Sequence, residues 1–211
     1  MLRKLLIALA ILIVIFVIAD FAAKAYATSQ LRDRAEHAVK GATSASASIT
    51  SFPFSARLLL GGEVQKVHLT VGPVDASHVT FESVSLDLDD VRVDRNRLIN
   101  HQQVQLTGLS SGTVTAELTD TEISRLAGTR VTFHPGRVTV SAAGVDVGAT
   151  VQMTDGSMSF GGLRLPIKFR IPRGPLFPCD ATNAVVKEGA VDVSCTINRV
   201  PAELAGVTVK A

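Results

Sequence analysis

The stretch VHLTV, residues 67–71, alternates apolar with polar side chains. Because successive side chains of a β-strand point to opposite sides of its sheet, this period of two predicts a strand with one apolar and one solvated side. The same period recurs through most of the later chain, in residues 84–88, 91–93, 104–106, 114–118, 131–133, 138–140, 145–147, 158–160, 163–165, 167–171 and 191–193. Gly, Pro, Asn or Asp separates most of these segments, so the sequence predicts a mainly antiparallel sheet with short connections.

Two segments have a helical period instead. Residues 28–42 (TSQLRDRAEHAVKGA) place small apolar side chains at offsets of four, seven, eight and eleven from Leu31, with most of the charged residues on the other side. Thr119 and Glu122 stand three residues apart, as in a capping box, ahead of a short apolar helical pattern that Gly128 ends. We expect a long helix before the sheet and a one- to two-turn helix between two of its strands.

The N-terminus predicts export. Residues 5–19 (LLIALAILIVIFVIA) form an unbroken apolar run that follows Arg3 and Lys4. A basic start, an apolar run of this length and the small residues at Ala25 and Ala27 are typical of a secretory signal peptide, here residues 1–27. Basic residues at the N-terminus keep that end in the cytoplasm, so the body is sent outward.

The competing interpretation is an uncleaved membrane anchor over residues 3–23. The apolar run rises roughly 22 Å as a helix, which is short of a hydrocarbon core of roughly 30 Å. An anchor would therefore continue through residues 21–23, with Asp20 facing a polar neighbour. Both interpretations place the body in the periplasm or cell envelope, and the anchor would tether it to the cytoplasmic membrane.

The body, residues 28–211, has the length of a single domain with a sizeable core. The first 27 residues contain three basic residues and one acidic residue, so the 21 basic and 19 acidic residues of the whole chain leave 18 of each in the body. A balanced body lacks the clustered Lys and Arg that neutralise phosphates, which sets nucleic acid aside as a partner.

The two cysteines, Cys179 and Cys195, flank a predicted hairpin that turns at residues 187–189. Folding at this turn brings the thiols roughly opposite each other, and an oxidising compartment then favours a disulfide. Two free buried thiols are the alternative. A zinc site is not expected because no His stands at ligand spacing from either cysteine.

The sequence does not predict an enzyme. Ser110 stands in GLSSG, which only outlines a nucleophile elbow and lies between two predicted strands rather than at a strand-to-helix turn. The five His residues lack metal-ligand spacing; we expect His68 to be solvated and His134 to lie in a turn. The acidic run DLDD, residues 87–90, lacks the Gly and distal Glu of a calcium loop. We expect no catalytic residue, no metal and no cofactor.

Four basic residues, Arg164, Lys168, Arg170 and Arg173, gather in the segment RLPIKFRIPR, residues 164–173. Lys168 and Arg170 lie two residues apart and therefore share one side of a predicted strand. One interpretation is a solvated strand face. The other is a basic rim that receives an anionic lipid headgroup beside an apolar cavity.

Taken in order along the chain, these features resemble the LmeA-like phospholipid-binding family of actinobacteria, which is named for a role in lipomannan elongation. After the N-terminal apolar helix and the Ala-rich helix, the resemblance rests on the segments FPFSARLLLGGEVQKVHLTV, SLDLDDVRVDRNRLIN, VTAELTDTEISRL and LRLPIKFRI, and on PLFPC followed by AVVKEGAVDVSC. It covers nearly the whole chain after the signal segment. The FPF motif with its Leu-rich turn and following strand is the most specific part.

The resemblance implies an α+β fold of the tubular, BPI-like kind, in which a long N-terminal helix packs in a strongly curved, mainly antiparallel sheet around an elongated apolar cavity. It also implies binding of phospholipid, including phosphatidylinositol species, and a part in lipoglycan assembly, with no catalytic motif. The membrane surface and envelope glycosyltransferases are the further partners expected. The alternatives are a scaffold for envelope enzymes that never holds lipid, and a hydrolase or transferase with an unrecognised site.

In such a fold the segment SFPFSARLLLGG, residues 51–62, becomes a candidate lipid entrance. Two interpretations remain open for its large apolar side chains. They form a short helical lip that touches acyl chains or a membrane, or they plug one end of the core. The residues concerned are Phe52, Phe54, Leu58, Leu59 and Leu60.

Overall fold

The computed structural model describes residues 2–39, 41–76, 78–101, 103–142, 144–154, 156–161, 168–171, 177–200 and 209–210, and for residues 2–6, 8, 38, 142, 168–170 and 209–210 the backbone alone. Its helices are α1 (Leu2–Ala38), α2 (Phe54–Ala56), the π-helix η1 (Arg57–Gly61), α3 (Arg95–His101) and α4 (Asp120–Ala127). Its strands are β1 (Ser44–Thr50), β2 (Glu63–Gly72), β3 (Val74–Ala76), β4 (Val79–Phe81), β5 (Ser83–Val93), β6 (Gln103–Val104), β7 (Leu106–Gly108), β8 (Ser111–Thr119), β9 (Arg130–His134), β10 (Arg137–Ala142), β11 (Val145–Thr154), β12 (Ser157–Gly161), β13 (Lys168–Arg170), β14 (Asn183–Val186), β15 (Ala190–Ile197) and β16 (Val209–Lys210).

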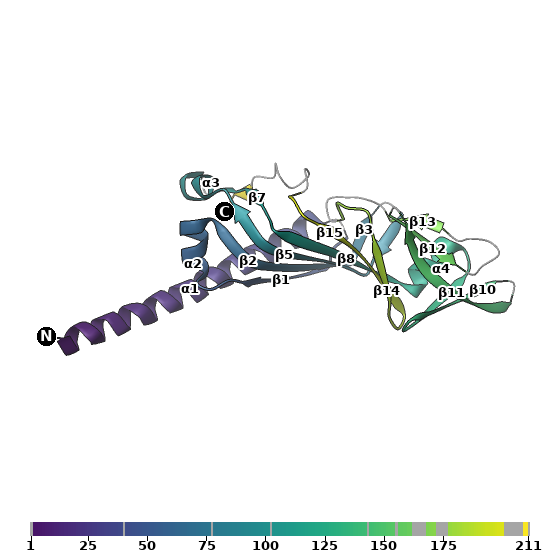
Figure 1. Cartoon of the computed structure of the whole chain (residues 1–211), viewed down its shortest axis with the longest axis horizontal. Helices are drawn as coiled ribbons and strands as arrows, with labels where there is room; N and C mark the ends of the chain where they lie inside the picture. Colours follow the sequence, from purple (N-terminus) through teal and green to yellow (C-terminus); the bar gives the residue numbers. More distant parts are fainter. Residues whose placement is uncertain are drawn as a thin grey trace.

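Most of the strands belong to two antiparallel sheets in an elongated molecule (Figure 1). The first has seven strands in the order β1-β2-β5-β8-β15-β14, with β7 also paired to β5. The second has five strands in the order β13-β12-β11-β10-β9. The α+β class with antiparallel sheets is confirmed, but the strands are divided between two main sheets rather than one. The reason is α4, which follows β8 and leads the chain away from the first sheet into β9.

A single continuous helix, α1, joins the predicted membrane segment to the body (Figure 1). Its second half lies along β1, the edge strand of the seven-stranded sheet, where Ala35 is buried and the backbone N–H of Ala45 donates to Glu36 Oε1 at 3.1 Å. The strand β1 (SASASIT) is not predicted from the sequence, because Ala and Ser alternate there with little contrast in hydropathy. These small side chains permit the close approach of the helix.

The strand β5 covers two segments that the sequence predicts as separate strands, residues 84–88 and 91–93. Between them, Asp90 has a φ of 49°, in the left-handed region that Asp adopts more readily than most residues. The buried positions change there from even to odd residue numbers, which breaks the sequence period without ending the strand. The helix α3 follows directly and is also not predicted; Asp94 Oδ1 accepts from the N–H of Arg97 at its first turn.

The short helix predicted between two strands is confirmed as α4, which follows β8 and precedes β9. Thr119 is its N-cap residue, and its Oγ1 accepts from the backbone N–H of Glu122 at 3.2 Å. Ile123 is fully buried beneath the helix. Gly128 ends the helix with a φ of 66°, a left-handed conformation that glycine adopts without steric cost.

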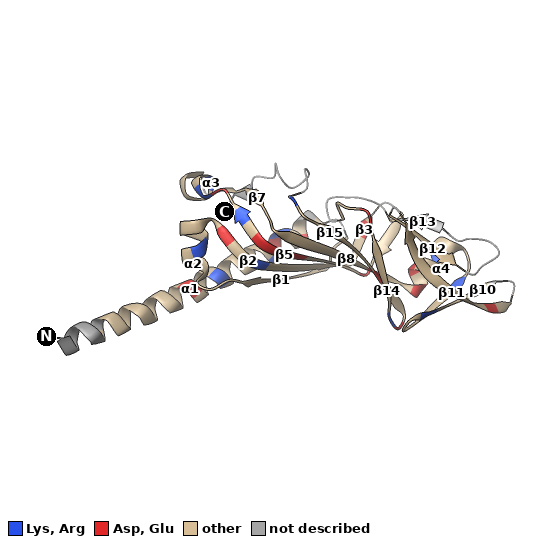
Figure 2. Ribbon diagram, in the orientation of Figure 1, with Lys and Arg blue, Asp and Glu red and all other residues tan. Residues whose placement is uncertain are grey.

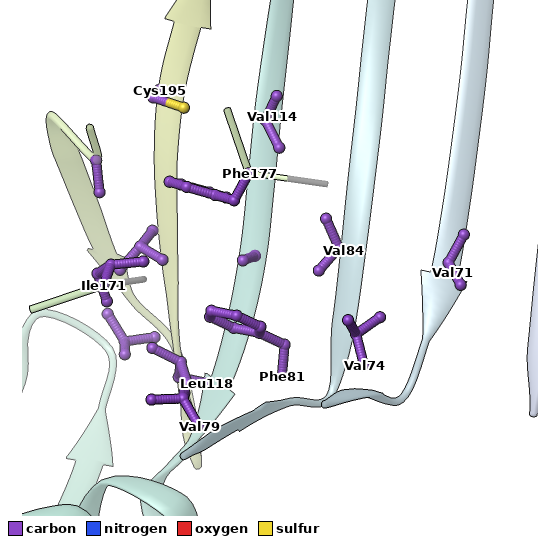
Figure 3. Packing of buried hydrophobic residues seen from close by; sticks show 14 of the residues in the cluster. Val71, Val74, Val79, Phe81, Val84, Val114, Leu118, Ile171, Phe177 and Cys195 are labelled. Carbon is purple, nitrogen blue, oxygen red and sulfur yellow. The ribbon is translucent and has the colours of Figure 1, made fainter. Parts of the chain in front are cut away.

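The core is filled by the protein's own side chains at the end of the sheet farthest from the start of α1. The rings of Phe81 and Phe177 stack with centroids 6.5 Å apart, and those of Phe133 and Phe160 with centroids 6.4 Å apart. Leu118 is fully buried. Figure 3 shows Phe81, Phe177 and Leu118 gathered on one side of the central strands. This end of the seven-stranded sheet is therefore a packed interior.

Candidate functional site

The part of α1 that projects from the body is apolar on all sides, and Figure 2 shows almost no charge along it. In the described part of the chain, α1 contains the one stretch that is long and apolar enough to cross a membrane, and only 6% of that stretch is buried in the body. A helix that is apolar all round requires an apolar environment such as a bilayer. The exposed large side chains are Ile7, Leu9, Ile11, Leu12, Ile13, Val14, Ile15, Phe16 and Ile18.

Asp20 ends this apolar run and is only 3% exposed, because its carboxylate binds the start of α2. Its Oδ2 accepts from the backbone N–H of Phe54 at 2.9 Å, and its Oδ1 accepts from that of Ser55 at 2.6 Å. N–H groups in the first turn of a helix have no partner within the helix. Pro53 precedes α2 and cannot cap it with a side-chain oxygen, so Asp20 supplies the cap from another helix.

The predicted entrance residues lie in what we call the connector, residues 52–61, which is helical as α2 and η1. They do not share one environment. Phe54 is 4% exposed and Leu58 packs against the core, whereas Phe52, Leu59 and Leu60 are 60%, 49% and 76% exposed. The connector therefore carries apolar side chains both into the core and out to its surface.

Gly62 fixes the direction in which the chain leaves the connector. Its φ is 67°, and a Cβ atom placed on it would lie 2.8 Å from the carbonyl oxygen of Val93. The Gly62 N–H donates to Leu58 O at 3.0 Å, while the Gly62 carbonyl accepts from the N–H of Val93 at 2.8 Å. Only glycine combines this left-handed conformation with so close an approach to β5. The turn places η1 directly beside the start of α3.

The apolar side of the seven-stranded sheet is partly open near α1. In the strand register, Leu69 of β2 lies opposite Leu86 of β5, and Leu86 lies opposite Val114 of β8. Val114 is fully buried, but Leu69 and Leu86 are only half-buried, as is Val67 on the same side of β2. We call Val67, Leu69 and Leu86 the apolar band. It lies between the buried pair Val64 and Val91, which follows the connector, and the packed core.

Two surface hollows lie at different places on the body. A groove of about 490 Å³ runs between α1 and β1 and is lined by the helix from Lys24 to Arg32 and by the strand from Ala45 to Ile49. A depression of about 660 Å³ around α4 and the start of β9 is lined mainly by polar side chains. Both are open to solvent. The enclosed apolar cavity implied by the family resemblance therefore stays a prediction.

Of the four basic residues proposed for an anionic headgroup, Lys168 and Arg170 are not brought beside the connector. Arg164 and Arg173 lie outside the described residues. Lys168 and Arg170 belong to β13, where the register sets them opposite Ser159 and Ser157 of β12. In Figure 1, β13 and the connector lie at opposite ends of the body. A headgroup held near β13 would therefore be far from the predicted entrance.

The predicted disulfide is present and joins Cys179, just before β14, to Cys195 of β15, with Cα atoms 6.1 Å apart. The hairpin that turns at residues 187–189 is confirmed as β14 and β15. The bond fixes β15 of the seven-stranded sheet to the segment that carries Phe177. It indicates an oxidising compartment.

The titratable side chains on the solvated side of the sheet pair with one another. His68 Nδ1 lies 2.6 Å from Asp87 Oδ1, and Lys66 Nζ lies 3.4 Å from Asp89 Oδ1. The Ser110 hydroxyl donates to Asp90 at 3.2 Å. Within the described ranges, no three His, Cys, Asp or Glu residues gather where a metal ion could be held.

His134 ends β9 instead of lying within the turn, and its Nδ1 is 3.0 Å from Glu188 Oε1. This pair connects the turn of the β14–β15 hairpin to the five-stranded sheet. His134 is therefore a surface contact between two hairpins.

The fold and site define an α+β protein with a disulfide, an apolar N-terminal helix and a partly open apolar sheet face. The model of the LmeA-like phospholipid-binding family matches residues 18–210, and the chain belongs to this family. No curated protein and no solved structure matches the chain. The matched region begins before Asp20, so it includes the residue that caps α2.

Sequence reasoning did not find two parts of this site. The sequence gives Asp20 a polar neighbour in the anchor interpretation, but it does not identify that neighbour as α2. Asp20 and Phe54 are 34 residues apart in sequence. Sequence reasoning recognised the alternation that contains Leu69 and Leu86 without separating them from fully buried positions such as Val114. The degree of burial depends on what packs above each strand, which alternation alone does not encode.

Proposed function

We propose that this protein binds phospholipid without catalysing a reaction. The acyl chains of the bound phospholipid lie on the apolar band and in the neighbouring groove beside α1. The family supports binding of phospholipid. The observation that carries the location is the partial burial of Leu69 and Leu86 on a sheet face that is fully buried at Val114. Covering apolar surface stabilises a complex by about 0.8 kcal/mol for each buried CH₂ group, so one acyl chain on this face offsets much of the cost of leaving the bilayer.

The proposed entrance is the connector. Leu59 and Leu60 are exposed beside the start of β2, and the apolar band lies farther along β2 and β5, beyond the buried pair Val64 and Val91. Apolar surface at one end of a partly open apolar face favours entry of an acyl chain from that end. Phe54 and Leu58 would anchor the connector to the body while its exposed residues touch lipid.

We further propose phosphatidylinositol species as the cargo and a role in lipomannan-type lipoglycan assembly in the periplasm or cell envelope. The family resemblance motivates both, and the disulfide agrees with an exported body. The basic residues Arg164, Lys168, Arg170 and Arg173 remain the proposed contacts for an anionic headgroup. Envelope glycosyltransferases are the proposed recipients.

Lipid analysis of the purified full-length chain tests this function. We expect phospholipid to remain bound in a mild detergent, with phosphatidylinositol species enriched over the source membrane. The double variant Leu69→Gln with Leu86→Gln should lose most of this lipid, because two polar groups would be buried against acyl chains. The control Lys66→Gln, on the solvated side of β2, should retain it.

Two results together would argue against the proposed location: retained lipid with the composition of the bulk membrane, and an equal amount of it in the double variant. Complete absence of retained lipid would favour the scaffold alternative, in which the sheet binds envelope enzymes. Turnover of a glycolipid that a single Ser or Asp substitution abolishes would favour an enzyme.

A further inference from the structure

The predicted cleavage site lies in the middle of a continuous helix. Residues 25–27 are helical, with no break in α1 on either side. On the C-terminal side, Ala35 and Val39 pack against or within the core of the body. On the N-terminal side, Asp20 caps α2. Both sides of the site are therefore in contact with the folded body.

Cleavage after Ala27 would remove contacts that the body uses. The N–H groups of Phe54 and Ser55 would lose Asp20 as their acceptor. The ring of Phe52 would lose its neighbour Phe21, whose centroid lies 6.5 Å away. The first turn of α2 contains Phe54, a buried core residue, so the loss would reach the interior.

Asp20 also marks a depth in the membrane. The fifteen apolar residues before it rise about 22 Å, and continuing through residue 23 brings the apolar rise to about 28 Å, close to the thickness of a hydrocarbon core. The helix would then leave the bilayer at the level where Asp20 and Phe21 contact the connector. The connector would then lie at the surface of the membrane that α1 crosses.

The surface presented at this level is apolar and bordered by cations. We call Phe52, Leu59, Leu60 and Ile99 the end patch; their exposed fractions are 60%, 49%, 76% and 54%. Ile99 belongs to α3, which Arg95 joins to η1 by donating to the carbonyl oxygen of Leu60. Figure 1 shows α2 beside the point where α1 leaves the body and α3 at the same end, beyond α2.

Three basic side chains are held next to the end patch. Lys24 Nζ lies 5.6 Å from the centroid of the Phe21 ring, and Arg57 Nε donates to Phe52 O at 3.3 Å. Arg95 is the third. Exposed apolar side chains beside basic ones match the interface of a leaflet that contains anionic phospholipid.

We propose that α1 is retained as a membrane anchor and that the end patch docks into the outer leaflet of the same membrane, with Asp20 fixing the connector at that depth. The occupant of the end patch is thus the phospholipid surface from which α1 emerges. The entrance to the apolar band then opens directly at the leaflet. Docking does not depend on lipid being held by the sheet, so it can fail or succeed separately from the proposed function.

The absence of Trp from the chain permits a direct test. Single variants Leu59→Trp and Val185→Trp are made in the full-length chain and reconstituted into vesicles of phosphatidylcholine and phosphatidylglycerol with brominated acyl chains. Leu59 and Val185 are 49% and 51% exposed, and Val185 lies on β14, away from the connector. We expect bromine to quench most of the fluorescence of Leu59→Trp and little of that of Val185→Trp. Equal quenching of the two variants would overturn the docking proposal.

The role of Asp20 is tested by adding Asp20→Ala to Leu59→Trp, with Asp33→Ala as a control on the exposed part of the same helix. We expect quenching to fall with Asp20→Ala and not with Asp33→Ala, while an unchanged circular dichroism spectrum reports that the body remains folded. Unchanged quenching would remove Asp20 from the proposal.

Retention of α1 is tested by the intact mass of a C-terminally tagged chain taken from its native membrane. We expect a mass that includes residues 2–27. A mass that begins at residue 28 would refute the anchor, whereas loss of bound phospholipid with the anchor still present would refute only the proposed function.

Discussion

Leu69 of β2 lies directly opposite Leu86 of β5, and both side chains are half-buried although they point to the same side of the sheet as the packed core. Leu118 of β8 lies on that side as well but is fully buried. The same residue type thus occupies a partly open and a closed environment on one sheet. This contrast separates the proposed lipid surface from the structural core.

The two environments predict different costs of truncation. Leu118→Ala should lower the free energy of unfolding by about 3 kcal/mol, because it leaves a cavity in a packed core. Leu86→Ala should cost only about 1 kcal/mol, because its side chain is already partly exposed and leaves no closed cavity. Urea denaturation with the disulfide intact measures both. Equal, large losses would mean that the apolar band is packed as tightly as the core.

Substitutions in the connector should separate effects on stability from effects on lipid uptake. Phe54→Ala should lower the free energy of unfolding by about 3 kcal/mol, since Phe54 is 4% exposed. Leu59→Ser should leave the Tm nearly unchanged and reduce phospholipid uptake, because Leu59 is 49% exposed. Thermal denaturation and lipid uptake from vesicles distinguish the two. A large fall in Tm with Leu59→Ser would assign Leu59 to the core instead.

The Cys179–Cys195 bond should contribute about 3 kcal/mol to stability, as expected for a closed loop of this length, in which the cysteines are 16 residues apart. Adding a reductant should therefore lower the Tm of the native chain. The double variant Cys179→Ser with Cys195→Ser should start from the lower Tm and not respond to the reductant. An unchanged Tm of the native chain after complete reduction would contradict this prediction.

Glu122 connects α4 to the β3–β4 pair, and this contact should be sensitive to acid. A hydrogen bond from Arg125 lowers the pKa of Glu122, burial opposes that shift, and a hydrogen bond from the backbone N–H of Thr80 at 2.8 Å adds to the lowering. Because the pKa is lower in the folded state, the contact stabilises fully above the ordinary pKa of Glu and is lost as pH falls toward the lowered value.

The variant Glu122→Gln tests this sign. It should lower the free energy of unfolding by about 1–3 kcal/mol at neutral pH, where it removes a charged hydrogen-bond acceptor. Its difference from the native chain should shrink as the pH is lowered through the range in which Glu122 becomes protonated. Denaturation curves across acid pH measure the difference; a constant or growing difference would show that Glu122 is not the group that titrates.

The headgroup proposal predicts a loss that depends on lipid charge. Lys168→Glu with Arg170→Glu should weaken binding to anionic lipid selectively and leave binding to phosphatidylcholine unchanged. Arg130→Glu with Arg137→Glu changes the charge equally on β9 and β10 and serves as the control. Vesicle co-sedimentation measures all three proteins. Unchanged binding to anionic vesicles would retire β13 as the headgroup site.

Alternation and capping patterns are local, so the sequence alone predicts the antiparallel strands, α4 with its Thr119 cap, and the β14–β15 hairpin with its disulfide. It does not predict β1, whose Ala and Ser residues differ too little in hydropathy, or α3. It places candidate site residues in the connector and in β13 without indicating that these lie at opposite ends of the molecule.

The tertiary structure decides the partner of Asp20, the division of the strands into two main sheets, and the partial exposure of Leu69 and Leu86. Each of these depends on segments that are distant in sequence and adjacent in space. The alternation of residues along a strand shows which side each side chain occupies, because the backbone geometry fixes that side locally. What covers that side is determined only when the whole chain has packed.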